Sequence, residues 1–223
     1  VKELPDIQRS FSRIENLMAS AEKNISGNLR ITTLSDFSPL LNPALKAFRQ
    51  AYPKLRIQII ATDDIIPLAS GAAHVSLRAG PKPNEPDLIV KKLKAPEIHY
   101  YAADSYVKEY GVPKDSSEYK QHLWALPSAD KRKIPFVKQI LKHIDEEQII
   151  YQSNHFPDVH NAVIEGMAIG PIGTHHSSKY DHLHRLDIKL DEGLEGLWFV
   201  YHKDLKNSAR IQALLEFLSK SLN

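Results

Sequence analysis

The sequence predicts an α/β protein in which strands alternate with helices along most of the chain. Two apolar stretches, residues 27–33 and 55–60, have the β-branched character of strands. Between them Leu41, Leu45 and Phe48 recur near helical spacing, which gives a strand–helix–strand unit of ordinary length. The alternation then continues towards the C-terminus, as in proteins with largely parallel sheets.

The helix of this first unit has recognisable ends. Ser35 and Ser38 are side chains that can cap a helix, and Pro39 suits a first helical turn. Pro53 marks the stop, because the residue before a proline avoids helical geometry. Backbone N–H groups at a helix start lack intrahelical partners, so this position favours small anions.

The segment 1–25 predicts a helix that pairs with a second chain. Apolar residues recur at alternating spacings of three and four, as in the core of a coiled coil. The candidate dimerisation residues are Leu4, Ile7, Phe11, Ile14 and Met18. An amphipathic helix packed on its own domain is the alternative, but charges on the other faces favour pairing.

The remaining elements follow in the same pattern. Further strands are expected at 74–77, 88–93, 98–102, 123–126, 148–152, 168–172 and 197–201. Helices are expected at 62–70, 105–110, 135–144, 156–166 and 209–218. Three prolines between 81 and 86 bound an exposed loop, and the stretch around 177–178 is expected to be a surface loop.

Composition and motifs exclude several classes of function. A net charge of +2 is too small to argue for nucleic acid or an anionic membrane, and no apolar run approaches the length of a membrane span. Zero cysteines exclude disulfides and thiolate metal sites. The 11 histidines have no recognisable metal-ligand spacing. Hydrolase, phosphate-loop and zinc-protease motifs are absent, so we expect no enzyme, no cofactor and no metal.

Five segments carry a resemblance to a known family. They are Gly27-x-Leu29-Arg30-Ile31, Leu41-x-Pro43-x-Leu45-x-x-Phe48-x-x-x-Tyr52-Pro53, Val75-Ser76-Leu77-Arg78, Val163-x-x-Gly166-Met167-Ala168-Ile169-Gly170 and Leu197-Trp198-Phe199-Val200-Tyr201-His202. In this order and spacing, the sequence resembles the effector-binding domain of LysR-type transcriptional regulators. The N-terminal heptads resemble the family's linker helix.

The resemblance implies two Rossmann-like subdomains joined by two crossing strands, as in type 2 periplasmic binding proteins, with a long N-terminal helix in front. The expected bounds are 1–25 for the linker and dimerisation helix, 27–98 plus 203–223 for subdomain I, and 99–202 for subdomain II. One departure is His74, which stands where the family usually has an acidic residue.

The same resemblance implies a cytoplasmic bacterial regulator that forms a homodimer or homotetramer. Contact with DNA is expected only through a helix-turn-helix domain ahead of the linker helix, which the printed sequence does not include, and no membrane partner is expected. A periplasmic-type solute-binding receptor is the alternative, because it shares the architecture. The heptad pattern and the lack of a visible signal peptide favour the regulator.

In the family, a small effector binds between the subdomains, and ligands of open α/β sheets lie beyond the carboxyl ends of strands. Residues at those ends are therefore the candidate effector-binding residues: Thr33, Ser35, Ser38, Thr62, Arg78, Ser128, Asn154 and Phe156. Each has a structural alternative, such as a helix cap for Ser35, an internal salt bridge for Arg78 or core packing for Phe156. The helix start and Arg78 favour an anionic effector with a carboxylate.

Overall fold

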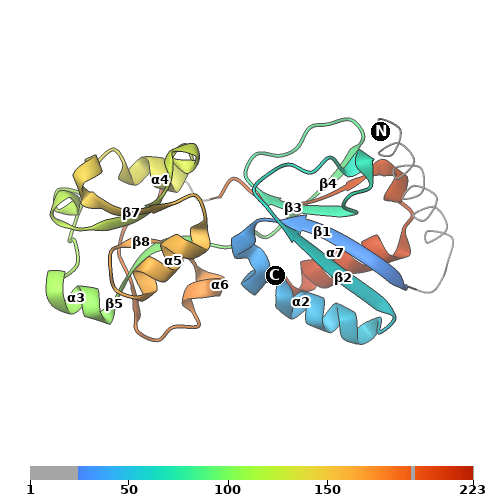
Figure 1. Ribbon diagram of the computed structural model, residues 1–223, viewed down its shortest axis with the longest axis horizontal. Helices are drawn as coiled ribbons and strands as arrows, with labels where there is room; N and C mark the ends of the chain where they lie inside the picture. The colour runs from blue at the N-terminus through green and yellow to red at the C-terminus, as the bar shows by residue number, and fades with distance from the viewer. Residues whose placement is uncertain (1–24, 192–193, 223) are drawn as a thin grey trace, which may run out of the picture. The chain divides into compact units, whose positions relative to one another are not determined.

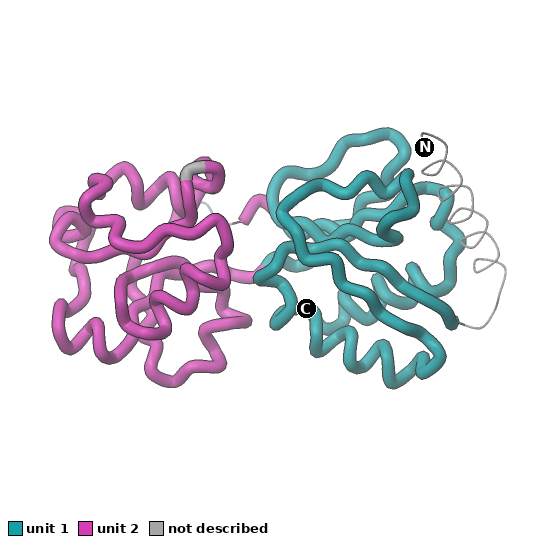
Figure 2. Tube along the Cα trace, in the orientation of Figure 1, with its two compact units in different colours: residues 1–95, 196–223 teal, residues 96–195 magenta. Residues whose placement is uncertain are grey.

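The computed structural model describes residues 25–191 and 194–222, which fall into two compact units. Unit 1 runs to Ala95 and resumes at Gly196, and unit 2 spans Pro96–Glu195 (Figure 2). These boundaries differ from the expected ones at 98/99 and 202/203, because strand 197–202 pairs within unit 1 and Ile98 pairs within unit 2. All five candidate dimerisation residues lie outside the described residues.

Unit 1 is built on a five-stranded mixed sheet (Figure 1). Its strands are β1 (Gly27–Thr33), β2 (Leu55–Ala61), β3 (Val75–Ala79), β4 (Leu88–Leu93) and β10 (Leu197–His202), in the order β2-β1-β3-β10-β4. Strand β1 runs parallel to β2 and β3, whereas β10 is antiparallel to β3 and β4. The carboxyl ends of β1, β2 and β3 therefore meet at one edge.

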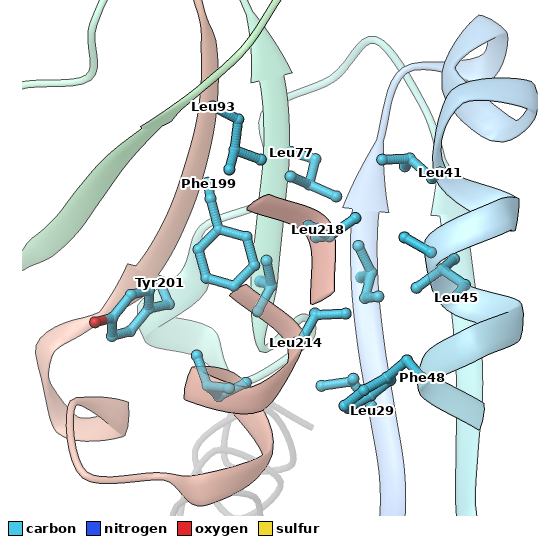
Figure 3. Close-up of a cluster of buried hydrophobic side chains, with 14 of the residues drawn as sticks. Leu29, Leu41, Leu45, Phe48, Leu77, Leu93, Phe199, Tyr201, Leu214 and Leu218 are labelled. Carbon is cyan, nitrogen blue, oxygen red and sulfur yellow. The ribbon is translucent and has the colours of Figure 1, made fainter. Parts of the chain in front are cut away.

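Two helices, α2 (Ser38–Ala51) and α7 (Ala209–Leu222), cover one face of this sheet and form its main core (Figure 3). Leu29 and Ile31 of β1 contribute to this core and are fully buried, so the alternating residues Arg30 and Thr32 lie on the opposite face. The predicted strand–helix–strand unit is confirmed, and Leu41, Leu45 and Phe48 are all buried.

The opposite face of the sheet is covered by short irregular segments. The expected helix over 62–70 is reduced to the 3-10 turn η2 (Leu68–Ser70), whose Leu68 packs with Ala73 and Val200. The 3-10 turn η6 (Lys203–Leu205) follows β10 and packs its Leu205 into the main core on the side of α2 and α7.

The start of α2 differs from the expectation in one respect. The 3-10 turn η1 (Ser35–Phe37) follows β1 directly, and Phe37, already in the helical region, occupies the N-cap position. Ser38 is therefore the first helical residue, and no side chain hydrogen-bonds the cap. Pro39 lies in the first turn as predicted, but the prediction that the serines cap this helix is wrong.

Unit 2 contains two small sheets. Strands β8 (Gly170–Gly173), β5 (Ile98–Ala103) and β9 (Leu183–Arg185) pair antiparallel in that order, and β6 (Trp124–Pro127) pairs in parallel with β7 (Ile149–Ser153). A parallel bridge between Trp124 and Ile169 connects the two sheets. The described sheets are thus mixed rather than largely parallel, because β5 and β10 run opposite to the strands beside them.

Short helices surround these sheets. They are α3 (Asp104–Tyr110), α4 (Pro135–Ile140), α5 (Phe156–Ile164) and α6 (Thr174–Ser177), with the 3-10 turns η3 (Tyr119–Gln121), η4 (Ala129–Lys131) and η5 (Glu146–Gln148). The core centres on Trp124, which is fully buried and donates its indole N–H to the Tyr119 carbonyl at 2.9 Å. Tyr100 and Tyr119 meet its ring edge-on, with centroids 5.6 and 5.5 Å away.

His74 lies just before β3 between two arginines and is only 3% exposed. Its Nδ1 accepts a hydrogen bond from the Arg30 backbone N–H at 2.8 Å, and the Arg210 guanidinium lies 3.4 Å from its Nε2. Burial, followed by the charges of Arg210 and Arg30, lowers the pKa of His74 to about 3. The unfolded chain therefore takes up a proton at higher pH than the folded one, so this site loses stability as the pH falls from 6.5 towards 3.

We expect His74→Asp to raise the free energy of unfolding at neutral pH by about 1 kcal/mol, because a carboxylate oxygen can replace Nδ1 and attract both arginines. His74→Asn is the control, because it keeps the acceptor without the charge. Urea unfolding of both variants measures the difference. The stability supplied by the aspartate should disappear only below about pH 4, the usual range of its pKa. An aspartate variant no more stable than the asparagine variant would contradict this reasoning.

Candidate functional site

The carboxyl ends of β1, β2 and β3 form the first group of candidate residues. The Thr62 N–H donates to the Thr33 carbonyl at 3.0 Å, which extends the pairing of β1 and β2 beyond the sheet. The Thr62 hydroxyl accepts from the Asp64 N–H at 3.1 Å and thereby shapes the turn that follows. Thr33, Thr62 and Arg78 are therefore brought together, as expected for strand ends of one parallel group.

Arg78 links these strand ends through its guanidinium group. It donates to the carbonyls of Thr62 and Asp64 at 2.5 and 2.6 Å, to the Thr32 hydroxyl at 3.0 Å and to the Ser76 hydroxyl at 3.3 Å. Burial lowers the pKa of Arg78, an effect opposed by the charges of Asp63 and Asp64. All four of these hydrogen bonds go to neutral oxygens, so Arg78 acts primarily as a positioning residue for the edge.

Thr33 is the most deeply buried candidate at this edge. Its side chain is 0% exposed, and its hydroxyl has no hydrogen-bond partner within the described part of the chain. Thr33 follows the alternation of Leu29 and Ile31, so its side chain is on the face covered by α2. Ser35 and Ser38 open η1 and α2 a few residues later and are partly exposed. A buried hydroxyl and a helix start without a side-chain cap thus occur in one short segment.

The carboxyl ends of β6 and β7 form the second group, within unit 2. The Ser128 N–H donates to the Ser153 carbonyl at 2.8 Å and joins the two strand ends, while the Ser128 hydroxyl donates to Asp130 at 2.7 Å. Asn154 is exposed, and its carbonyl accepts a hydrogen bond from the Lys131 ammonium group. Ser128 and Asn154 are therefore part of one hydrogen-bonded edge.

Phe156 begins α5 beside this edge and is partly buried. Its ring lies against those of Phe136 and His160, with centroids 6.2 and 6.0 Å away, and Lys131 Nζ lies 5.4 Å from its centroid. Phe156 thus packs on buried rings on one side and contacts the Lys131 ammonium group on the other. Lys131 is not among the residues that sequence reasoning assigned to this site. Its position a few residues after the predicted strand 123–126 was the available signal.

The histidine-rich segment also differs from the expectation. His175 and His176 are not in a surface loop but form α6, and the His176 ring packs on His160 of α5 with centroids 5.1 Å apart. The described residues contain no group of three or more ligating side chains placed to hold a metal ion. Among the helices in the described ranges, none combines the length and apolar character that a membrane crossing requires.

Two α/β units, between which the chain crosses twice, have polar side chains at the carboxyl ends of parallel strands, and this arrangement defines a class of ligand-binding domains. The family described as the LysR substrate binding domain matches residues 22–223, so this chain belongs to that family. It is a non-enzymatic family that acts in transcription regulation, which confirms the resemblance and the expectation that the chain is not an enzyme. No helix-turn-helix domain is detected within the 223 residues.

Relatives of known sequence agree with this assignment. The chain is 27% identical over 202 residues to the HTH-type transcriptional regulator DmlR of Escherichia coli, covering 86% of this chain and 64% of that protein. It is 28% identical over 120 residues to an uncharacterized HTH-type transcriptional regulator of Haemophilus influenzae, covering 53% of this chain and 40% of that protein. The chain therefore spans less than two thirds of the length of both relatives.

Solved structures show the same fold. CrgA, a LysR-type transcriptional regulator from Neisseria meningitidis, superposes with a TM-score of 0.79 at 17% identity, covering 98% of this chain and 76% of that one. The full-length virulence activator AphB of Vibrio cholerae superposes with a TM-score of 0.72 at 16% identity, covering 97% of this chain and 76% of that one. The expected periplasmic-binding-protein-like α/β fold is confirmed.

Proposed function

We propose that this domain senses a small anionic metabolite, that the anion carries a carboxylate, and that its binding alters the arrangement of the DNA-binding domains of a regulator. One observation carries the choice of place: the Thr33 hydroxyl is buried without a hydrogen-bond partner in the described part of the chain, and it lies just ahead of η1, the turn that leads into α2. A ligand oxygen there gains hydrogen bonds from this hydroxyl and from backbone N–H groups at the positive end of the helix dipole.

Each candidate residue has a role in this proposal. The hydroxyls of Ser35 and Ser38 donate to the carboxylate, and neither serine is occupied in capping α2. Arg78 holds the turn after β2 and so fixes Thr62 beside Thr33. In unit 2, the edge formed by Ser128, Asn154 and Phe156 is a separate group of candidate binding residues, to which Lys131 adds a positive charge.

The proposal extends to partners. The relatives named above are HTH-type regulators that are longer than this chain, which supports DNA contact through a separate domain. We propose that the chain acts in the cytoplasm as a homodimer or homotetramer, and that Leu4, Ile7, Phe11, Ile14 and Met18 form the pairing surface.

Ser35→Asp is expected to weaken binding of an anionic effector about tenfold or more, because a second negative charge at the helix start repels the ligand carboxylate. Ser35→Asn is the control, because asparagine has the same shape as aspartate and no charge. Calorimetric titration of the parent and both variants against a panel of carboxylate metabolites measures the effect. Equal affinity of all three proteins for an anion refutes the site. Binding restricted to cationic or wholly apolar compounds refutes the anion.

A further inference from the structure

Helices α5 and α6 of unit 2 meet through histidine rings. His160 of α5 is 4% exposed, and its ring is tilted by 41° against that of His176, with centroids 5.1 Å apart. The series of rings continues from His160 to Phe156 at 6.0 Å and from His176 to Tyr180 at 5.6 Å. Two imidazoles that gain a charge at acidic pH thus form the contact between these helices.

The surroundings of these rings favour their neutral forms. Burial, followed by the charges of the neighbouring His176 and His175, lowers the pKa of His160 to about 3. Burial and the charge of Lys179 lower the pKa of His176, and its Nε2 is buried without a hydrogen-bond partner in the described part of the chain. No carboxylate contributes to either shift, so nothing in the described structure compensates added protons.

The other titratable groups near this contact do not change that conclusion. On α5 itself, Asp158 accepts a hydrogen bond from the Ser153 hydroxyl at 2.6 Å, and His155 precedes the helix. The strands packed against α5 supply His99, Tyr100 and Tyr101 from β5 and Tyr151 from β7, while β6 and β8 supply no titratable side chain. After α6, the His182 ring lies 5.8 Å from that of Tyr180, and its Nε2 lies 3.1 Å from the Ile164 carbonyl of α5. None of these groups is among the causes of the lowered pKa of His160.

Helix α6 is short and makes few backbone hydrogen bonds to the rest of unit 2. It comprises four residues and ends where the Ser178 N–H donates to the Thr174 carbonyl at 3.1 Å. One further backbone hydrogen bond, from the Thr174 N–H to the Glu97 carbonyl at 2.9 Å, ties its start to the segment before β5. The packing of its side chains on α5 therefore accounts for much of its stability.

We infer that the joint formed by His160, His176 and the turn through Tyr180 is a proton-responsive latch in unit 2. Above the pKa of exposed histidine, the imidazoles are neutral, the rings pack together, and α6 stays on α5. As the pH falls below about 6.5, the open form takes up protons that the closed form excludes, so opening becomes easier. Opening becomes easier at lower pH, and not at higher pH, because the packed histidines are harder to protonate than the released ones. They therefore stabilise the packed state only at higher pH.

Hydrogen exchange at the amides of Ser178, Lys179 and Tyr180 reports opening of the latch, because their N–H groups bond to carbonyls of α6. Between about pH 7.5 and about pH 5.5, release of His160 increases the open population about tenfold, and release of His176 adds at most a further factor of about ten. We expect the protection factors of these amides, corrected for the intrinsic pH dependence of exchange, to fall by between about tenfold and about a hundredfold.

Replacement by phenylalanine keeps a ring and removes the proton. His160→Phe should make the fall in protection about tenfold smaller, and the double variant His160→Phe/His176→Phe should abolish it. His143→Phe is the control, because His143 packs on Tyr119 in the same unit, with centroids 5.8 Å apart, away from the latch. Protection in the parent that does not change with pH overturns the inference. A fall that persists unchanged in a folded double variant also overturns it. If the double variant does not fold, His176→Phe alone should show a smaller fall than the parent, and an equal fall overturns the inference.

Discussion

Replacing Gly170 with valine is expected to lower the free energy of unfolding of unit 2 by about 3 kcal/mol or more. A Cβ added at this first residue of β8 would lie 2.6 Å from Val163 Cγ2 and 2.7 Å from the Ala125 carbonyl oxygen. Val163 is fully buried, and the Ala125 oxygen belongs to the backbone of β6, so neither atom can move away easily. This loss is a large part of the total free energy of unfolding of a typical domain, which is about 5–15 kcal/mol.

Trp124 gives a direct readout of this effect. Of the two tryptophans, Trp124 lies in the core of unit 2 and Trp198 in unit 1, so a Trp198→Phe background leaves fluorescence that reports unit 2 alone. Urea unfolding in that background should show a smaller loss of unfolding free energy for Gly170→Ala than for Gly170→Val. Gly111→Ala is the control, because Gly111 has a φ of +74° and open space around it, so it should cost only about 1 kcal/mol of backbone strain. A Gly170→Ala variant as stable as this control would refute the crowding argument.

Arg78→Met is expected to lower the free energy of unfolding of unit 1 by about 2–4 kcal/mol. Methionine fills a similar length but removes all four hydrogen bonds, and the carbonyls of Thr62 and Asp64 lose their charged donor. Because the turn after β2 is held mainly by this side chain, the same change should also raise hydrogen exchange at the Asp64 amide.

Arg56→Met is the matched control, because Arg56 lies exposed on β2 of the same sheet and its loss should change stability by less than about 0.5 kcal/mol. Trp198 is the fluorescent reporter, because it pairs with Arg78 across β3 and β10. Equal stability of Arg78→Met and Arg56→Met would mean that the strand ends hold together without the guanidinium group, and Arg78 would then be available to a ligand.

The sequence determined those features that depend on local pattern. Leu41, Leu45 and Phe48 repeat at helical spacing because one face of α2 must be apolar to cover a sheet, and all three are buried. Pro39 and Pro53 bracket that helix because proline restricts the backbone wherever it occurs, and α2 ends at Ala51. The expected strands at 88–93 and 98–102 likewise match β4 and β5 within one residue.

The tertiary structure decided the hydrogen-bond partners and burial of the polar residues, because the segments that surround them are distant in sequence. Arg78 is occupied by oxygens from residues 32, 62, 64 and 76, which only the pairing of three strands brings together. His176 is polar and adjoins serines, so the local sequence predicts a loop, yet its ring packs on a histidine sixteen residues earlier in the chain. A strong local apolar repeat with prolines at its ends is enough to predict a helix such as α2, whereas burial and charge at a given side chain depend on which elements pack against it.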